Sequence, residues 1–373
     1  MNARDGAVVF AGGGTGGHLY PAIAIAQALG SPDRIAFIGT ADRLEATIVP
    51  EAGYRLYSVR SRPLTRKLSF ELLRTLVANA RGAWQSAFLL ARLKPRLVIA
   101  TGGYVCFPVV LAARCLRAVR RLHAPIAVLE PNARPGLTNR LLAPLVDEVW
   151  GAFRDADPRF AGKYVHTGIP VRASLARLPQ REAALARLGL SPERKTLLAM
   201  GGSQGARSIN DALAGLTVKH ALPPGWQLIH VTGEREYDRV RSALGADAGP
   251  AVRPYLNDVA DAYAAADLVL ARAGASTLGE LMAVGLPSIL VPYPHAADDH
   301  QTRNAEVFAA AGAAILMTDR ELAAGQLAAT LESAIVPERL HAMRAAALGL
   351  QNGSPIATIL ARIDALAARK TLG

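Results

Sequence analysis

The sequence predicts an α/β protein made of two doubly wound, Rossmann-like domains that face a cleft. Three observations support this prediction. Short β-branched runs alternate with Ala- and Leu-rich stretches at helical spacing, which is typical of parallel sheets covered by helices. The order of strand, glycine turn and helix that opens the chain begins again at residue 197. The 373 residues, 51% of them hydrophobic, exceed one ordinary domain and can fill two cores.

The expected strands are short apolar runs that end in turn residues. In the first half of the chain they cover residues 7–11, 34–39, 54–59, 96–101, 125–130, 147–152 and 163–168. In the second half they cover residues 196–201, 226–233, 267–272, 287–293 and 313–317. The segments between them have the length and composition of helices, so both sheets are expected to be parallel.

The domain boundary is expected near "TGIPVR" at 167–172. We therefore expect an N-terminal domain over 1–168 and a C-terminal domain over 169–350, with 351–373 forming a helix that returns to the N-terminal domain. Doubly wound domains bind ligands at the carboxyl ends of their strands, so a ligand shared by both domains would lie in the cleft between them.

Positive charge is concentrated in the first half of the chain. Residues 1–180 hold 24 Lys and Arg against 11 Asp and Glu, whereas the remainder holds 18 against 19. This asymmetry indicates an anionic partner, which could be nucleic acid, an anionic membrane surface or a phosphorylated substrate. Cys106 and Cys115 belong to no Cys-x-x-Cys motif and match no His cluster, which favours a reduced, cytosolic chain without structural zinc.

The first glycine turn has the spacing G-x-G-x-x-G at Gly12, Gly14 and Gly17. A nicotinamide or flavin dinucleotide site would also need an acidic residue at the end of the second strand, which ends instead in Gly39 and Thr40. Glycines nevertheless allow close approach of a ligand, and amides at a helix N-terminus stabilise an anion. A purely structural turn is the alternative.

Two further turns follow strands in the second half. Residues 201–205, "GGSQG", repeat the glycine loop and add a hydroxyl group. After Arg272, a run of small residues precedes a helix that carries Glu280, whose carboxylate could accept hydrogen bonds from both ribose hydroxyls. The spacing of Thr277 and Glu280 also fits a capping box, which would be purely structural.

His18 is the first candidate for a general base. No Walker lysine, Gly-x-Ser-x-Gly motif or Cys/His nucleophile motif is present. A neutral imidazole beside the first glycine loop could take a proton from a hydroxyl, although it could also merely cap the loop or pack. Glu130 is the second candidate. Neither 292–305, with its two His and two Asp, nor "DAD" at 155–157 has convincing metal-ligand spacing.

Seven motifs in order resemble those of the peptidoglycan GlcNAc transferases that form lipid II: "GGTGGH", "TGGY", "EPNARPGLTN", "GIPVR", "GGSQGAR", "RAGASTLGE" and "HQTRNA". They span roughly residues 8 to 310. The resemblance implies a glycosyltransferase fold of the B type, used without a metal or other cofactor. It also implies transfer of GlcNAc from UDP-GlcNAc to the 4-hydroxyl of undecaprenyl-diphosphate-linked MurNAc-pentapeptide, with inversion at the anomeric carbon.

The resemblance also assigns residues to the two substrates. Those placed around the donor are Thr15, Gly16, Gly17, Asn132, Arg172, Ser203, Leu256, Ala275, Ser276, Thr277, Leu278, Gly279, Glu280 and Gln301. Those placed in loops for the acceptor and its diphosphate are Gly13, Gly14, Gly102, Gly103 and Tyr104. Glycine-loop amides and helix dipoles would stabilise the charge that develops on the departing UDP in place of a metal.

The segment 60–95 is both basic and amphipathic. Between residues 55 and 96 there are ten basic residues and one acid. One helical face collects Phe70, Leu73, Val77, Ala80, Trp84 and Phe88. We expect a peripheral contact with the anionic cytoplasmic face of the inner membrane through Arg62, Arg66, Lys67 and Trp84. The alternative is that the apolar face packs on the sheet.

Three rival functions remain open at this point. A UDP-GlcNAc 2-epimerase resembles the same fold and uses the same donor, but it would leave the basic amphipathic segment unexplained. A nicotinamide-dependent oxidoreductase is weakened by the missing acid. A nucleic-acid-binding module lacks the pattern of aromatic and basic residues on which bases stack, so no nucleic acid partner is expected.

Overall fold

The computed structural model describes residues 6–63, 70–154, 157–202, 204–245, 252–256, 258–351 and 353–369. The chain divides into two compact units, the first made of Met1–Arg172 with Asn352–Gly373 and the second of Ala173–Gln351. The boundary expected after residue 168 thus lies slightly before the one that the structure gives. The last helix belongs to the first unit.

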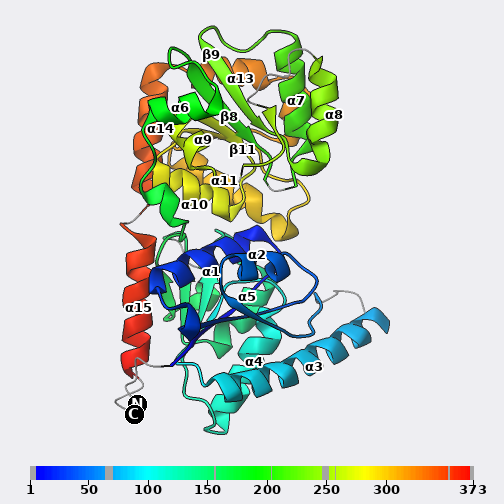
Figure 1. Ribbon diagram of the computed structural model, residues 1–373, viewed down its shortest axis with the longest axis vertical. Coiled ribbons are helices and arrows are strands. Elements are labelled where there is room, and N and C mark those ends of the chain that lie inside the picture. Colours follow the sequence, from blue (N-terminus) through cyan, green and yellow to red (C-terminus); the bar gives the residue numbers. More distant parts are fainter. Residues whose placement is uncertain are drawn as a thin grey trace. The chain divides into compact units, whose positions relative to one another are not determined.

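The first unit, whose helices are labelled in Figure 1, contains a seven-stranded parallel sheet in the order β3-β2-β1-β4-β5-β6-β7. Its strands are β1 Val8–Ala11, β2 Ile35–Gly39, β3 Arg55–Ser58, β4 Leu97–Ala100, β5 Ile126–Glu130, β6 Glu148–Gly151 and β7 Tyr164–His166. The strand order reverses between β1 and β4, so the loops that follow these two strands meet at the place where doubly wound sheets bind ligands.

Helices cover both faces of this sheet. They are α1 Gly16–Leu29, α2 Glu45–Glu51, α3 Phe70–Leu93, α4 Cys106–Ala118, α5 Leu137–Leu142 and α15 Pro355–Arg369. Alternate residues of a strand face opposite sides, so Val9 packs with Val109 of α4 in one core and Phe10 packs with Leu19 of α1 in the other. Ile359 of α15 completes the second core.

Helix α15 is tied to the sheet by a buried carboxylate. Glu148 of β6 accepts a hydrogen bond from Trp150 Nε1 at 2.9 Å and forms an ion pair with Arg362 of α15. Together with the apolar side of α15, this network explains why the final helix packs on the first unit.

The second unit contains a six-stranded parallel sheet in the order β10-β9-β8-β11-β12-β13. Its strands are β8 Lys195–Met200, β9 Trp226–Val231, β10 Val252–Arg253, β11 Leu268–Ala271, β12 Ser288–Leu290 and β13 Ala314–Leu316. The sequence analysis missed β10, because a two-residue strand shows no periodicity. The two sheets bear out the predicted α/β, Rossmann-like class.

The helices of the second unit alternate with its strands as expected. They are α6 Arg181–Leu188, α7 Arg207–Val218, α8 Tyr237–Leu244, α9 Ala260–Ala265, α10 Ala275–Val284, α11 His300–Ala310, α12 Asp319–Ala323, α13 Leu327–Ala334 and α14 Pro337–Leu350. Ile209 and Leu213 of α7 pack with Leu197 of β8 and Leu331 of α13 in one core.

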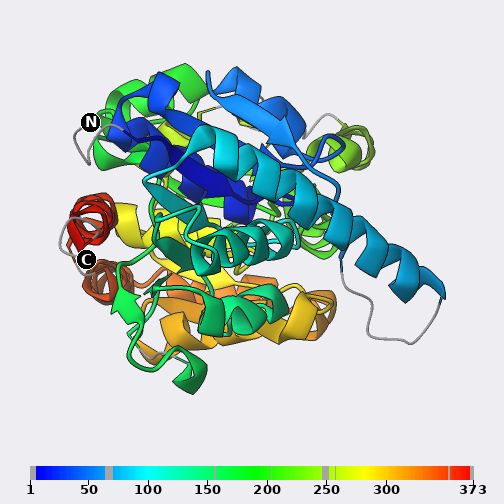
Figure 2. The same cartoon turned by 90° about the horizontal axis from the view of Figure 1, so that it is seen from below.

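Helix α3 is the longest helix in the described part of the chain and projects from the first unit at its Phe70 end (Figure 2). It packs beside α4, and its buried residues form a narrow stripe of small or polar side chains that ends in one leucine: Thr75, Asn79, Gly82, Ser86 and Leu90. No helix among the described residues has the length and apolarity that a bilayer crossing requires.

Candidate active-site loops

Two glycine loops of the first unit lie directly against each other. They follow β1 and β4, the strands at which the sheet order reverses. Gly103 has φ +84°, and a Cβ there would lie 2.5 Å from the carbonyl oxygen of Gly13, so no other residue fits. Gly14 approaches the ring of Tyr104, with 3.8 Å between its Cβ position and Cε1. The structure thus brings together the loops predicted for the acceptor, including Gly102.

A buried thiol contacts the backbone of both loops. Cys106, the first residue of α4, has its Sγ 3.1 Å from the oxygen of Ala11 and 3.0 Å from that of Gly102. Burial raises the pKa of this thiol to about 12. It therefore stays protonated at neutral pH and acts as a loop contact, not as a nucleophile.

The sequence analysis missed Glu45, which organises the first loop. Its carboxylate is 1% exposed and accepts hydrogen bonds from Gly14 N (2.8 Å), Thr40 N (2.9 Å) and Thr40 Oγ1 (2.7 Å). An acid is thus present at the carboxyl ends of β1 and β2, but it is buried and engaged with protein donors. It cannot hold a ribose, which weakens the oxidoreductase alternative further.

His18 lies in the first turn of α1, at the edge of both glycine loops. The residue is half-buried, and a Cβ at Gly102 would overlap its Nδ1, so the imidazole packs directly on the second loop. The packing part of the alternative interpretation is therefore confirmed. The position also suits a base for a hydroxyl bound at these loops, and that role stays a prediction.

Glu130, the second candidate base, holds the loop that follows β5. One carboxylate oxygen accepts from Asn132 N at 3.0 Å and Nδ2 at 3.2 Å, and the other accepts from Gly136 N at 3.2 Å and Asn139 Nδ2 at 2.8 Å. Burial raises the pKa of Glu130 to about 7, although these hydrogen bonds lower it. Four donors on one buried carboxylate favour a positioning role over proton transfer.

Except for Asn132, which bonds Glu130, the predicted donor residues of the first unit lie at or beside the first turns of α1. Thr15 is the exposed N-cap residue of that helix, followed by Gly16 and Gly17. The Arg172 guanidinium lies 5.0 Å from the ring centre of Tyr20, which in turn packs against Gly16. Amides in the first turn of a helix have no acceptor within that helix, so this end of α1 suits an anion.

The glycine loop of the second unit is held by a buried polar chain. Gly205 packs against the Thr232 carbonyl so closely that a Cβ would overlap it. That carbonyl accepts from Asn210 Nδ2 at 2.9 Å, and Asn210 Oδ1 meets His230 Nε2 at 2.9 Å. Ser203 itself lies outside the described residues. Leu256, the residue expected to face uracil, is half-buried beyond β10.

Helix α10 begins as the candidate donor site requires. Its N-cap is Gly274 and makes no side-chain cap, so the capping box of Thr277 and Glu280 is wrong. Glu280 is instead half-buried and accepts a hydrogen bond from Tyr263 OH at 2.8 Å. Ser276 Oγ is buried and makes no hydrogen bond within the described part of the chain, so it could take one from a ligand.

The other predicted residues of this helix differ in their surroundings. Ala275 and Gly279 are buried beside the turn, and Thr277 is half-buried. Leu278 is fully buried, so its side chain serves the core and not a ligand. Asn304, which the sequence analysis did not single out, donates from Nδ2 to the Ala273 carbonyl at 3.1 Å and fixes the turn before the helix.

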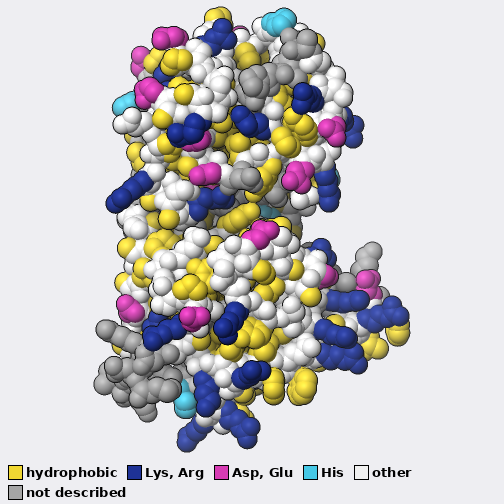
Figure 3. Space-filling model, viewed as in Figure 1, with side chains coloured by type: hydrophobic (Ala, Val, Ile, Leu, Met, Phe, Trp, Pro, Cys, Tyr) yellow, Lys and Arg dark blue, Asp and Glu magenta, His cyan; other side chains and the backbone are white. Residues whose placement is uncertain are grey.

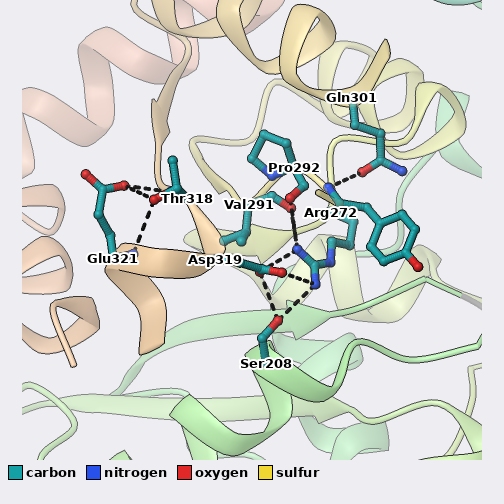
Figure 4. A network of polar contacts seen from close by, with 9 residues as sticks. Ser208, Arg272, Val291, Pro292, Gln301, Thr318, Asp319 and Glu321 are labelled. Carbon is teal, nitrogen blue, oxygen red and sulfur yellow. Dashed lines mark hydrogen bonds and ion pairs between the residues drawn. The ribbon is translucent and has the colours of Figure 1, made fainter. Parts of the chain in front are cut away.

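Arg272, at the end of β11, joins three elements around this turn (Figure 4). It donates to Asp319 Oδ1 at 2.7 Å, to Ser208 Oγ at 2.9 Å and to the Pro292 carbonyl at 3.0 Å. Gln301 Oε1, on α11, accepts from Tyr293 N at 3.0 Å. Arg272 thus fixes Pro292, and the amide of the next residue, Tyr293, holds the side chain of Gln301, a predicted donor residue.

The apolar face of α3 is exposed, so the alternative that it packs on the sheet is wrong. Trp84 is 74% exposed, and the face carries further exposed apolar side chains at Phe70, Leu73, Leu76, Val77 and Phe88. Basic and hydrophobic side chains lie together where α3 projects (Figure 3). Arg62 is exposed before the helix. Arg66 and Lys67 lie outside the described residues.

The two weak metal motifs gain no support from the described residues. Asp157 forms an ion pair with Arg159 at 2.8 Å, and Asp155 lies outside the described ranges. His300 Nδ1 contacts the Ala297 carbonyl at 2.8 Å. No group of three or more His, Cys, Asp or Glu in the described part of the chain is arranged to hold a metal ion.

Comparison with known proteins gives the same assignment for both units. The glycosyltransferase family 28 N-terminal domain matches residues 8–150, and the C-terminal domain of that family matches residues 196–359. The UDP-N-acetylglucosamine–N-acetylmuramyl-(pentapeptide) pyrophosphoryl-undecaprenol N-acetylglucosamine transferase of Desulforudis audaxviator is 41% identical over 98% of this chain and 99% of its own. That of Moorella thermoacetica is 42% identical over 95% and 97%.

Solved structures agree with these matches. A crystal structure of Acinetobacter baumannii MurG aligns with 96% of this chain and 99% of its own, with a TM-score of 0.74 and 25% identity. The crystal structure of a putative UDP-N-acetylglucosamine 2-epimerase from Listeria monocytogenes shares the fold alone, with 13% identity and a TM-score of 0.64. The chain therefore belongs to the family of UDP-N-acetylglucosamine–N-acetylmuramyl-(pentapeptide) pyrophosphoryl-undecaprenol N-acetylglucosamine transferases, as the sequence motifs predicted.

Proposed function

We propose that this chain transfers GlcNAc from UDP-GlcNAc to undecaprenyl-diphosphate-linked MurNAc-pentapeptide, which yields lipid II for peptidoglycan synthesis. The observation that carries the proposal is the match to transferases named for this reaction, which extends over nearly the whole chain. The geometry of the loops supports it, because in each unit a glycine turn suited to a diphosphate follows a strand of the sheet.

The second unit supplies most of the proposed donor site. Glu280 accepts hydrogen bonds from the ribose hydroxyls, and Ser276 and the 201–205 loop face the nucleotide. Gln301, held beside Tyr293, contacts the sugar. In the first unit, the start of α1, Asn132 and Arg172 stay predicted contacts of the donor, as the sequence motifs imply.

The proposed reaction is a single displacement. His18 takes the proton from the 4-hydroxyl of the muramyl sugar as its oxygen bonds to the anomeric carbon of GlcNAc. The bond from that carbon to the UDP oxygen breaks, and UDP leaves with the electron pair. Amides of the glycine loops and helix N-termini stabilise the charge on the diphosphate, so no metal is required. Attack opposite the leaving group inverts the centre from α to β.

The lipid end of the acceptor is proposed to stay in the bilayer while α3 rests on the surface. An exposed apolar face with Trp84, together with exposed Arg62, Arg74 and Arg81, suits the interface of an anionic leaflet. The protein would then be peripheral to the cytoplasmic face of the inner membrane.

The test is UDP release from UDP-GlcNAc with and without the lipid-linked acceptor. The proposal expects release that depends on the acceptor, together with a new lipid that contains GlcNAc. Conversion of the donor to its C2 epimer in the absence of acceptor would instead establish the epimerase. Release of UDP at the same rate with and without the acceptor would contradict the transferase.

A further inference from the structure

Glu45 places a carboxylate in the interior of the first unit, where its three donors come from two loops. It is the first residue of α2, and its oxygens accept from Gly14 N and from both the amide and the hydroxyl of Thr40. An unpaired buried carboxylate is costly, and these three hydrogen bonds offset that cost. The loop after β1 and the loop after β2 are therefore joined through one side chain.

The backbone on both sides is shaped around this carboxylate. A Cβ at Gly13 would overlap the Glu45 carboxyl group, and a Cβ at Gly39 would lie 2.7 Å from its Cγ. Gly14, which donates the amide, has φ +86°, a conformation that favours glycine. Glu45 and these glycines together fix where the carbonyl of Gly13 meets Gly103 in the second loop.

We propose that Glu45 is a positioning residue that holds the Gly12–Thr15 loop in place for the acceptor diphosphate. This inference rests on the proposed function. Glu45 does not contact the substrate, because it is buried and a carboxylate would repel a phosphate. It also turns the Gly14 amide inward, so the acceptor diphosphate meets the remaining groups of the loop and Gly102–Gly103.

The test compares Glu45→Gln with Glu148→Gln. Glu45→Gln keeps the volume but replaces one acceptor oxygen by an NH2 group, so one of the three donors faces another donor. Glu148 is a matched control, since it is a buried carboxylate of the same unit that bonds Trp150 and Arg362 away from the glycine loops. Steady-state kinetics are measured with each substrate varied, at temperatures equally far below each variant's Tm. Hydrogen exchange of residues 11–17 is followed in parallel.

Glu45→Gln is expected to lower kcat/KM for the lipid acceptor by about 10- to 100-fold, mainly through KM. The KM for UDP-GlcNAc should stay within about threefold, and exchange in 11–17 should rise. Glu45→Asp, which keeps the charge, should recover part of the loss. Glu148→Gln should leave the acceptor KM and the exchange of 11–17 unchanged.

Three results would overturn the role of Glu45: equal losses in both variants, a matching rise in the KM for UDP-GlcNAc, or unchanged exchange in 11–17. Failure of the proposed function gives a different result, since the unmodified protein would then transfer no GlcNAc to the acceptor. In that case the hydrogen exchange of residues 11–17 in Glu45→Gln still tests the role of Glu45 in positioning the loop: unchanged exchange overturns it, and raised exchange supports it.

Discussion

The carboxylates of Glu45, Glu130 and Glu280 serve different purposes, and their burial and hydrogen bonds separate them. Glu45 and Glu130 are buried and accept three and four hydrogen bonds from protein donors. Glu280 is half-buried and accepts a hydrogen bond from Tyr263 OH. Of the three, Glu280 is the carboxylate that solvent can reach, so we propose that it is the one that meets the ribose.

Glu280→Ala is expected to weaken UDP-GlcNAc binding by about 1.5–3 kcal/mol, the range for a hydrogen bond to a charged group. Isothermal calorimetry with UDP-GlcNAc measures it. Tyr263→Phe, which removes the internal partner and leaves the carboxylate, should weaken binding less. If Glu280→Ala leaves the affinity for UDP-GlcNAc unchanged, the carboxylate only joins α9 to α10 through Tyr263.

His18→Ala is expected to lower kcat by roughly 10²- to 10⁴-fold, because the acceptor hydroxyl would lose its base. Donor affinity should change little, since backbone amides hold the diphosphate. His123→Ala, at an exposed histidine of the same unit, is the control. If His18→Ala instead raises the KM of a substrate while kcat is preserved, the imidazole is a binding or packing group.

Glu130 makes stability depend on pH. Its pKa rises from 4.5 to about 7 in the folded chain, so between these values the folded state binds more protons than the unfolded state. The free energy of unfolding should therefore fall as pH rises from about 4.5 to 7, by on the order of 3 kcal/mol from this group. Urea unfolding of Glu130→Gln should lack this part of the slope. Parallel pH profiles for both proteins would show that the carboxyl titrates normally.

At the scale of elements, the helix α3 has two faces with different partners. The stripe of Thr75, Asn79, Gly82, Ser86 and Leu90 is buried, whereas the opposite face exposes large apolar side chains. Asn79 also bonds Ser61 Oγ and Arg62 N through its Oδ1, which fastens the chain before the helix. The helix packs through this narrow stripe, so the large apolar side chains of its amphipathic pattern face solvent and not the core.

Changing Trp84 and Phe88 together to Ser is expected to reduce binding to anionic vesicles several-fold, because each buries apolar area at the interface. These side chains are 74% and 62% exposed, so Tm should hardly change. Co-sedimentation with vesicles measures the binding, and Val218→Ser, an exposed apolar residue of the second unit, is the control. If the α3 double variant and the Val218→Ser control bind vesicles equally well, α3 does not contact the membrane.

Periodicity and turn residues were sufficient to predict most elements, since twelve expected runs coincide with strands of the two sheets. The two-residue β10 offered no such pattern. The site was predicted less completely, because its supports come from residues distant in sequence. Glu45 reaches Gly14 across 31 residues and Arg272 reaches Asp319 across 47, and no local spacing marks such pairs. The spacing of Thr277 and Glu280 likewise misled the prediction of a capping box, because α10 begins earlier, with Gly274 as its N-cap.

At the scale of the whole molecule, the two units divide the chemistry. The first unit holds the excess of positive charge, the paired glycine loops with His18, and the exposed face of α3. The second unit holds the polar networks around the predicted nucleotide site, from buried Asn210 to half-buried Arg272. A lipid-linked diphosphate and a nucleotide sugar are the substrates that these two sets of groups suit.

One measurement tests this account most directly. The protein is incubated in EDTA with UDP-GlcNAc labelled in the sugar and with undecaprenyl-diphosphate-linked MurNAc-pentapeptide, and the lipid product is identified by mass spectrometry and NMR. The account predicts one GlcNAc, β-linked to the 4-hydroxyl of the muramyl sugar, and one UDP released for each. A labelled C2 epimer of the donor with no change in the lipid would contradict the transfer, and activity restored by magnesium or manganese would contradict its independence of metal.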